Sequence, residues 1–139
     1  MITIIATIKP EHLRNIRSGR TKWDMRKNAP QTYGLDFKVL CCESGSGGKI
    51  LAEFVCNSVE ISKRQQESFL ERLVAESCVT MEQAKKYQGD GVLHFWHISK
   101  MIDYCKTKGQ RVRNVSEFGL KRAPQSWCYV KEGNDAKMQ

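Results

Sequence analysis

The sequence predicts an α+β fold, in which a small, partly closed β-barrel of about five or six strands is covered by inserted helices. Short runs rich in β-branched and aromatic residues recur along the chain, and helix-period patterns interrupt them in a few places. The 139 residues suffice for one domain with a single core.

The first elements are a strand, a helix and a second strand. Residues 2–8 form an apolar, β-branched run that is typical of a strand. Pro10 suits the first turn of a helix, and Gly19 is a natural stop after its last turn. The next strand is expected over residues 21–26, before Pro30 breaks the pattern.

Two further strands are expected over residues 37–42 and 49–61, on either side of a glycine-rich hairpin loop. A strand rather than a helix follows these glycines, so the loop is not of the phosphate-binding kind. Ser62 with Gln65 then predicts a capping box at the start of a helix. The apolar stripe of that helix is Phe69, Leu70, Leu73 and Val74.

Thr80 with Gln83 predicts a second capping box and a shorter helix. Residues 92–98 are the next expected strand, with an extension to Tyr104 as the alternative. Residues 106–114 are expected to form a basic polar loop, and residues 126–130 the last strand.

We expect a single domain over residues 1–131 and a flexible tail over residues 132–139. No apolar run is long enough for a bilayer and no secretory signal is recognisable, so a cytoplasmic location without a membrane partner is expected. The six cysteines lack C-x-x-C spacing and are expected to stay reduced, mostly as core residues. Neither a metal nor a cofactor is implied.

The net charge of +8, from 23 Lys and Arg against 15 Asp and Glu, suits a polyanionic partner. The alternative is that the charge serves solubility alone. The cations gather in five clusters: Arg14 to Lys27, Lys63-Arg64, Lys85-Lys86, Lys106 to Arg113 and Lys121-Arg122.

The strand over residues 21–26 has two different faces, because alternate side chains share a side. One face can pack into a core: Thr21, Trp23 and Met25. The other presents a cation, a carboxylate and a cation in a row: Lys22, Asp24 and Arg26.

This strand also resembles a pattern of ASCH domains, G-x-K-x-x-E-x-R, which follows their first helix. Gly19 and Arg26 match it, and Asp24 keeps the charge at the Glu position. Thr21 stands at the Lys position, with Lys22 one residue late.

Residues 116–130 resemble the closing segment of bacterial or phage ASCH proteins. The resemblance then covers roughly residues 2–131, and it implies a PUA-like barrel with a cleft for RNA or a nucleotide. The implied nucleic-acid-binding residues are Lys9, Lys22, Asp24, Arg26, Lys27, Lys121, Arg122, Gln125 and Ser126.

The chemistry of these residues fits that role. Arg26 could grip a phosphate or a base edge with its planar fork, and Asp24 could accept a hydrogen bond from an exocyclic amine. Trp127 is either an exposed stacking platform or a core residue. The alternative for the charged row is an exposed salt-bridge ladder of little energetic value.

Some ASCH-type proteins remove the acetyl group of N4-acetylcytidine with a Lys, a Thr nucleophile and a Glu on a later helix. Thr21 and Asp24 replace that Lys and Thr here, which speaks against this activity. Lys22, Asp24 and Glu76 remain the catalytic candidates for hydrolysis of a modified nucleoside or RNA. A third hypothesis is an adaptor whose basic face meets an acidic protein.

The histidines offer no catalytic pair. His94 and His97 are three apart on an expected strand and therefore point to opposite faces. His12 is expected in solvent on the first helix.

Overall fold

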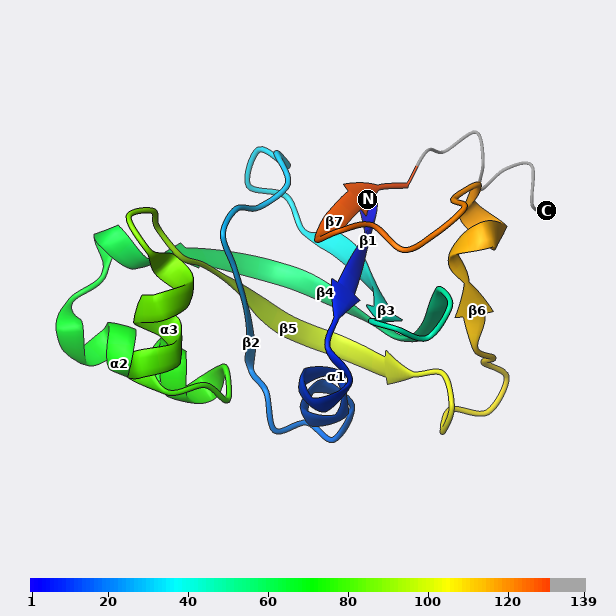
Figure 1. Ribbon diagram of the computed structural model, residues 1–139, viewed down its shortest axis with the longest axis horizontal. Helices are drawn as coiled ribbons and strands as arrows, with labels where there is room; N and C mark the ends of the chain where they lie inside the picture. Colours follow the sequence, from blue (N-terminus) through cyan, green and yellow to red (C-terminus); the bar gives the residue numbers. More distant parts are fainter. Residues whose placement is uncertain (131–139) are drawn as a thin grey trace.

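The structure is a computed structural model that describes residues 1–130, and the expected tail over residues 132–139 lies outside this range (Figure 1). The described residues form one curled, mixed sheet in the order β2-β5-β4-β3-β1-β7, with helices at its margins. The elements are β1 (Ile2–Ile8), α1 (Pro10–Arg17), β2 (Trp23–Arg26), β3 (Phe37–Glu43), β4 (Lys49–Ile61), the short 3-10 helix η1 (Ser62–Arg64), α2 (Glu67–Glu76), α3 (Met81–Gln88), β5 (His94–Asp103), β6 (Arg113–Asn114), the 3-10 helix η2 (Val115–Phe118) and β7 (Trp127–Tyr129).

The sheet confirms the predicted α+β half-barrel. β1 runs parallel to β3 and antiparallel to β7, and the remaining pairs are antiparallel. Residues 1–130 contain seven strands rather than the expected five or six. The additional strand, β6, lies in the expected basic loop and pairs Asn114 with Lys49 of β4. Two residues are too short a run to show a strand pattern in a sequence.

Three apolar clusters hold these elements together. Inside the half-barrel, β1, β3, β4 and β5 pack with α1 through a cluster that includes Ile4, Leu13, Val39, Phe54 and Trp96. A second cluster, around Tyr104 and Phe118, anchors η2. A third cluster, around Leu73 and Phe95, joins α2 and α3 to the outer face of β2 and β5. Figure 1 accordingly shows α2 and α3 at one end of the molecule, and β6 and η2 at the other.

The predicted capping box at Ser62 is wrong. The Ser62 hydroxyl accepts a hydrogen bond from the backbone N–H of Leu93 at 2.9 Å, and Gln65 donates to Glu60 instead. Residues 62–64 form η1, and α2 begins only at Glu67. A long-range bond from Leu93, the residue just before β5, has therefore replaced a local cap.

The second predicted cap is confirmed. Thr80 Oγ1 accepts from the Gln83 backbone N–H at 3.1 Å, and Gln83 Oε1 accepts from the Thr80 N–H at 2.9 Å. In the preceding helix, Leu73 and Val74 are buried as predicted. Phe69 is 36% exposed, so it lies at the margin of the expected stripe.

Side chains join the two outer edges of the sheet. The Trp127 indole N–H donates to Asn28 Oδ1 at 2.7 Å, and the backbone N–H of Gln31 donates to the Tyr129 hydroxyl at 2.9 Å. Both bonds connect β7 to the segment that follows β2. The half-barrel is thus closed on this side by side chains rather than by a strand ladder.

Cys41, Cys42 and Cys56 are buried, as expected of core cysteines. Cys78 and Cys128 are half-buried, Cys105 is exposed, and all six thiols are free. Within residues 1–130, no helix combines the length and the apolar character needed to cross a membrane.

Candidate functional site

A cavity of about 480 Å³ lies between α1, β2 and α3, and we call it the cleft. Its volume is within the range of about 300–1,000 Å³ that is common for small-molecule sites. Side chains from both faces of β2 line the cleft, and β2 is one of the two edge strands of the sheet. The cleft therefore follows the open edge of β2, where an edge strand presents backbone N–H and C=O groups.

Asp24 and Arg26 form the floor of the cleft as an ion pair. Arg26 Nε donates to Asp24 Oδ2 at 3.0 Å, and the two side chains are only 13% and 9% exposed, respectively. The guanidinium also lies 5.4 Å from the centre of the Trp96 ring. The second carboxylate oxygen, Asp24 Oδ1, accepts no hydrogen bond from any residue in the range 1–130, so it remains an acceptor for a ligand.

The other donors of Arg26 bond within the protein. Its Nη2 donates to the carbonyl of Thr7 at 3.2 Å, and its Nη1 lies 3.4 Å from both the carbonyl and the hydroxyl oxygen of Ser126. Arg26 thereby ties β2 to β1 and to the start of β7. A buried guanidinium needs such partners, and they occupy the planar fork that could otherwise grip a phosphate.

Helix α1 forms one wall of the cleft. Lys9, His12 and Asn15 lie three residues apart in succession and line the cavity from one side. α1 starts after Lys9 with Pro10 in its first turn and without a side-chain cap. The backbone N–H groups of the first turn therefore have no side-chain acceptor of their own.

Helix α3 forms the opposite wall with Gln83 and Tyr87, which are four residues apart on one helical face. The Lys27 ammonium lies 4.9 Å from the centre of the Tyr87 ring. Burial raises the pKa of the Tyr87 phenol, while the Arg26 charge lowers it and the Asp24 charge raises it. The phenol thus lines the same cavity as the ion pair on the floor.

The predicted residues of the first strand divide into two groups. Lys9, Asp24 and Arg26 line the cleft, and Lys27 reaches its rim over Tyr87. Lys22 lies ahead of β2 on the surface, and its ammonium donates to the Gly19 carbonyl at 3.3 Å. The charged row of Lys22, Asp24 and Arg26 therefore does not form one exposed face of the strand.

The predicted C-terminal residues meet the cleft only at its floor, through the contact of Ser126 with Arg26. Lys121, Arg122 and Gln125 are exposed and lie outside the lining of the cleft, as the described residues define it. Trp127 is half-buried and packs edge-to-face on Trp96 with ring centres 6.2 Å apart, in line with the core alternative.

The catalytic candidates do not converge. Glu76 Oε1 accepts from the Trp23 indole N–H at 3.0 Å, and Oε2 from Arg72 at 3.4 Å. The Trp23 bond is the main cause that lowers the pKa of Glu76. Among residues 1–130, the lining of the cleft includes Asp24 but neither Glu76 nor Lys22.

Sequence reasoning missed His12, Cys78, Gln83 and Tyr87, which line the cleft beside the expected residues. His12 is half-buried rather than in solvent. The four-residue spacing of Gln83 and Tyr87 was the available signal, but it does not say which surface their helix covers.

A second cavity of about 720 Å³ lies between the 29–35 segment and β4. Arg64 and His94 line it, and burial lowers the pKa of His94. Among residues 1–130, its lining includes none of those predicted for nucleic-acid binding. The cleft is therefore the stronger candidate site.

No known family model matches the chain, and no curated protein matches it. Among solved structures, the chain is similar to the crystal structure of ASCH from Zymomonas mobilis, with a TM-score of 0.73 and 14% sequence identity over 98% of this chain and 92% of that chain. Two single-substitution mutants of the same protein match with TM-scores of 0.71, identities of 12% and 13%, and coverage of 98% of this chain and 93% and 95% of theirs. The protein therefore has the PUA-like half-barrel fold of ASCH proteins.

Proposed function

We propose that the protein binds RNA or a nucleotide in the cleft between α1, β2 and α3. The observation that carries the proposal is the combination of a cavity of about 480 Å³ with a paired carboxylate on its floor. In this proposal, Asp24 Oδ1 accepts a hydrogen bond from the exocyclic amine of a base. The open edge of β2 supplies further backbone groups for a base edge.

The walls of the cleft suit the other parts of a nucleotide. Tyr87 offers an aromatic ring, on which a base can stack with little regard to sequence. Lys9 stands at the uncapped start of α1, where the helix dipole and free N–H groups favour a phosphate. The net charge of +8 adds long-range attraction for a polyanion.

The test is fluorescence anisotropy with labelled single-stranded RNA, duplex RNA and single-stranded DNA, from low to physiological salt. We expect binding of one nucleic acid to persist at physiological salt and to weaken in Lys9→Gln and in Tyr87→Ala. Lys86→Gln is the matched control, since this exposed lysine lies on α3 but outside the lining of the cleft. Binding that vanishes with salt and ignores both variants would contradict the proposal.

The same samples address the two alternatives. Incubation with N4-acetylcytidine and with RNA, followed by chromatography, reports any hydrolase activity, and Asp24→Asn should abolish it if Asp24 takes part. An adaptor for an acidic protein predicts no nucleic-acid binding at physiological salt and a partner that can be isolated by pull-down.

A further inference from the structure

A basic segment, residues 104–122, lies at the end of the half-barrel away from α2 and α3 (Figure 1). Residues 104–122 hold six cations and one carboxylate, so this segment contributes +5 to the net charge of +8. The cations, which we call the basic strip, are Lys106, Lys108, Arg111, Arg113, Lys121 and Arg122. All are exposed except Arg113, which is half-buried, and the lining of the cleft within residues 1–130 includes none of them.

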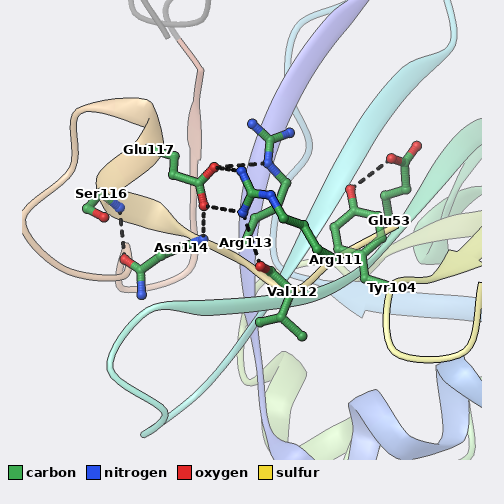
Figure 2. A network of polar contacts seen from close by, with 8 residues as sticks. All are labelled: Glu53, Tyr104, Arg111, Val112, Arg113, Asn114, Ser116 and Glu117. Carbon is green, nitrogen blue, oxygen red and sulfur yellow. Dashed lines mark hydrogen bonds and ion pairs between the residues drawn. The ribbon is translucent and has the colours of Figure 1, made fainter. Parts of the chain in front are cut away.

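The carboxylate of this segment, Glu117, orders two of the arginines. Arg111 donates to both of its oxygens, at 2.7 and 3.1 Å, and Arg113 Nε approaches Oε1 at 3.4 Å. The backbone N–H of Asn114 donates to Glu117 Oε2 at 2.9 Å (Figure 2). Glu117 thus holds Arg111 and Arg113 in place while cancelling only part of the charge of the strip.

Arg113 keeps its terminal nitrogens available. The guanidinium lies 4.6 Å from the centre of the Phe118 ring, and within residues 1–130 no hydrogen bond uses its terminal amino groups. Figure 2 shows these groups pointing away from Glu117. The backbone of Arg113 is anchored by pairing with Ile50 of β4. A guanidinium held in this way loses little conformational freedom when it grips a phosphate.

The chain that follows the basic strip bonds to residues of the cleft. After Lys121 and Arg122 the chain reaches Pro124, whose carbonyl accepts a hydrogen bond from Thr7 Oγ1 at 2.6 Å. Thr7 lines the cleft, and Ser126 contacts Arg26 on its floor. Figure 1 shows this segment running from η2 back to β7, which lies beside β1.

We infer that the basic strip binds the phosphate backbone of a single-stranded RNA, one nucleotide of which occupies the cleft. The inference rests on the proposed function of the cleft and names its ligand as a chain rather than a free nucleotide. Exposed cations that follow one another along the chain suit the repeated phosphates of a strand. An RNA strand rather than an acidic protein is favoured, because the chain that follows the strip bonds to Thr7 and Arg26 of the cleft, and Tyr87 gives that cleft an aromatic wall.

The test compares labelled oligouridylates of about four and about twelve nucleotides, lengths within the range that single-strand-binding domains cover. The strip variant carries Lys106→Gln, Lys108→Gln, Lys121→Gln and Arg122→Gln, and it leaves Arg111, Arg113 and Glu117 in place. The control variant carries Lys63→Gln, Arg64→Gln, Lys85→Gln and Lys86→Gln, which remove the same charge from residues outside the cleft lining.

We expect the parent to bind the longer RNA more tightly, and the strip variant to bind it at least about tenfold more weakly at physiological salt. The salt dependence of log K should also become shallower by about 3, since each phosphate that a cation neutralises on a single strand adds about 0.7 to the slope. The short RNA should bind the parent and the strip variant alike, and the control variant should retain most of the affinity for both lengths.

The outcomes separate the strip from the cleft. In one outcome, the parent and the strip variant bind the longer RNA equally while Tyr87→Ala weakens the binding of both RNA lengths. That result would contradict phosphate binding by the strip and would still support nucleotide binding in the cleft. Weaker binding by the strip variant without any effect of Tyr87→Ala would contradict nucleotide binding in the cleft. It would also contradict the inference that one RNA strand occupies both the strip and the cleft. Unlabelled polyglutamate and unlabelled RNA are also compared as competitors for the longer labelled RNA. Equal displacement by the two would overturn RNA as the ligand and indicate an acidic protein as the partner.

Discussion

The cleft and the basic strip each contain an arginine–carboxylate pair, but the two pairs differ in burial. Arg26 and Asp24 are 9% and 13% exposed, whereas Arg111 and Glu117 are 69% and 20% exposed. The buried guanidinium bonds to Thr7 and Ser126 as well, and so it closes the half-barrel. The exposed pair orders a surface segment and leaves charge in solvent. Similar side-chain chemistry therefore serves the fold in one region and, in our proposal, the ligand in the other.

The largest expected effect is that of Arg26→Ala on stability. Removal of the guanidinium leaves Asp24 buried without its cation and opens the seam between β2, β1 and β7. Loss of one partner of a buried pair typically costs about 3–5 kcal/mol. Urea unfolding should show this destabilisation, whereas Arg111→Ala, the exposed counterpart, should shift the midpoint little. Similar urea midpoints for Arg26→Ala and Arg111→Ala would mean that the buried pair stabilises the fold no more than the exposed pair does.

This expectation also bears on binding assays. Arg26→Ala is a poor probe of the cleft, because weaker binding by a damaged barrel says nothing about a direct contact. Lys9 and Tyr87 are better probes, since their side chains line the cleft without closing the sheet.

A smaller effect is expected for Tyr87→Ala, on binding rather than on folding. Loss of a stacked base typically costs about 1–3 kcal/mol of binding free energy. Tyr87→Phe keeps the ring and should retain most of the affinity, whereas Tyr87→Ala should weaken RNA binding in the anisotropy assay. If Tyr87→Phe is as weak as Tyr87→Ala, the hydroxyl rather than the ring makes the contact.

The next effect is that of Thr80→Ala on α3, which carries Gln83 and Tyr87 to the cleft. Loss of the cap hydroxyl should destabilise the protein by about 1 kcal/mol and fray the first turn of the helix. Hydrogen exchange at the Gln83 amide should report the fraying. Thr107→Ala, at an exposed threonine within the basic segment, is the control and should leave exchange in α3 unchanged.

The smallest effect is expected for Glu117→Gln in the basic strip. The hydrogen bond from Arg111, with further ones from Asn114 and Arg113, lowers the pKa of Glu117 from 4.5 to about 2 in the folded protein. A pKa that is lower in the folded state gives stabilisation that is complete above about pH 4.5 and is lost as the pH falls toward about 2.

Glu117→Gln removes this contribution at neutral pH. The difference in unfolding free energy between parent and variant should therefore shrink as the pH falls below about 4.5, and it should shrink with added salt because Arg111 is exposed. Urea titrations at several pH values measure both trends. A difference that grows on acidification would mean that Glu117 is not held as a carboxylate by its neighbours.

Much of the fold could be predicted from local patterns. The bounds of β1 and β4 agree with the expected strands, and Pro10 begins α1 as its fixed backbone angle favours. The Thr80–Gln83 box formed as expected, because both of its hydrogen bonds join residues three apart. The Ser62–Gln65 box did not form, since the Ser62 hydroxyl bonds to Leu93, 31 residues away.

The candidate site was predictable only in part. The alternation of β2 placed Trp23 and Met25 against a core, and Asp24 and Arg26 together on its other face. It could not show that this second face is buried, because its burial depends on how the sheet closes. Gln83 and Tyr87 were missed because the packing of α3, rather than any property of its sequence, carries them to β2.

The sequence by itself determined the order of the helices and of every strand except β6, the excess of cations and the pairing of a carboxylate with an arginine in one strand, because these depend on residues a few positions apart. Only the tertiary structure decided what Arg26 does. Its partner Ser126 lies 100 residues further along the chain, and the curl of the sheet brings the two edges close enough for them to bond. The same closure fixes where the cleft lies, which side chains line it and where the chain that follows the basic strip meets it.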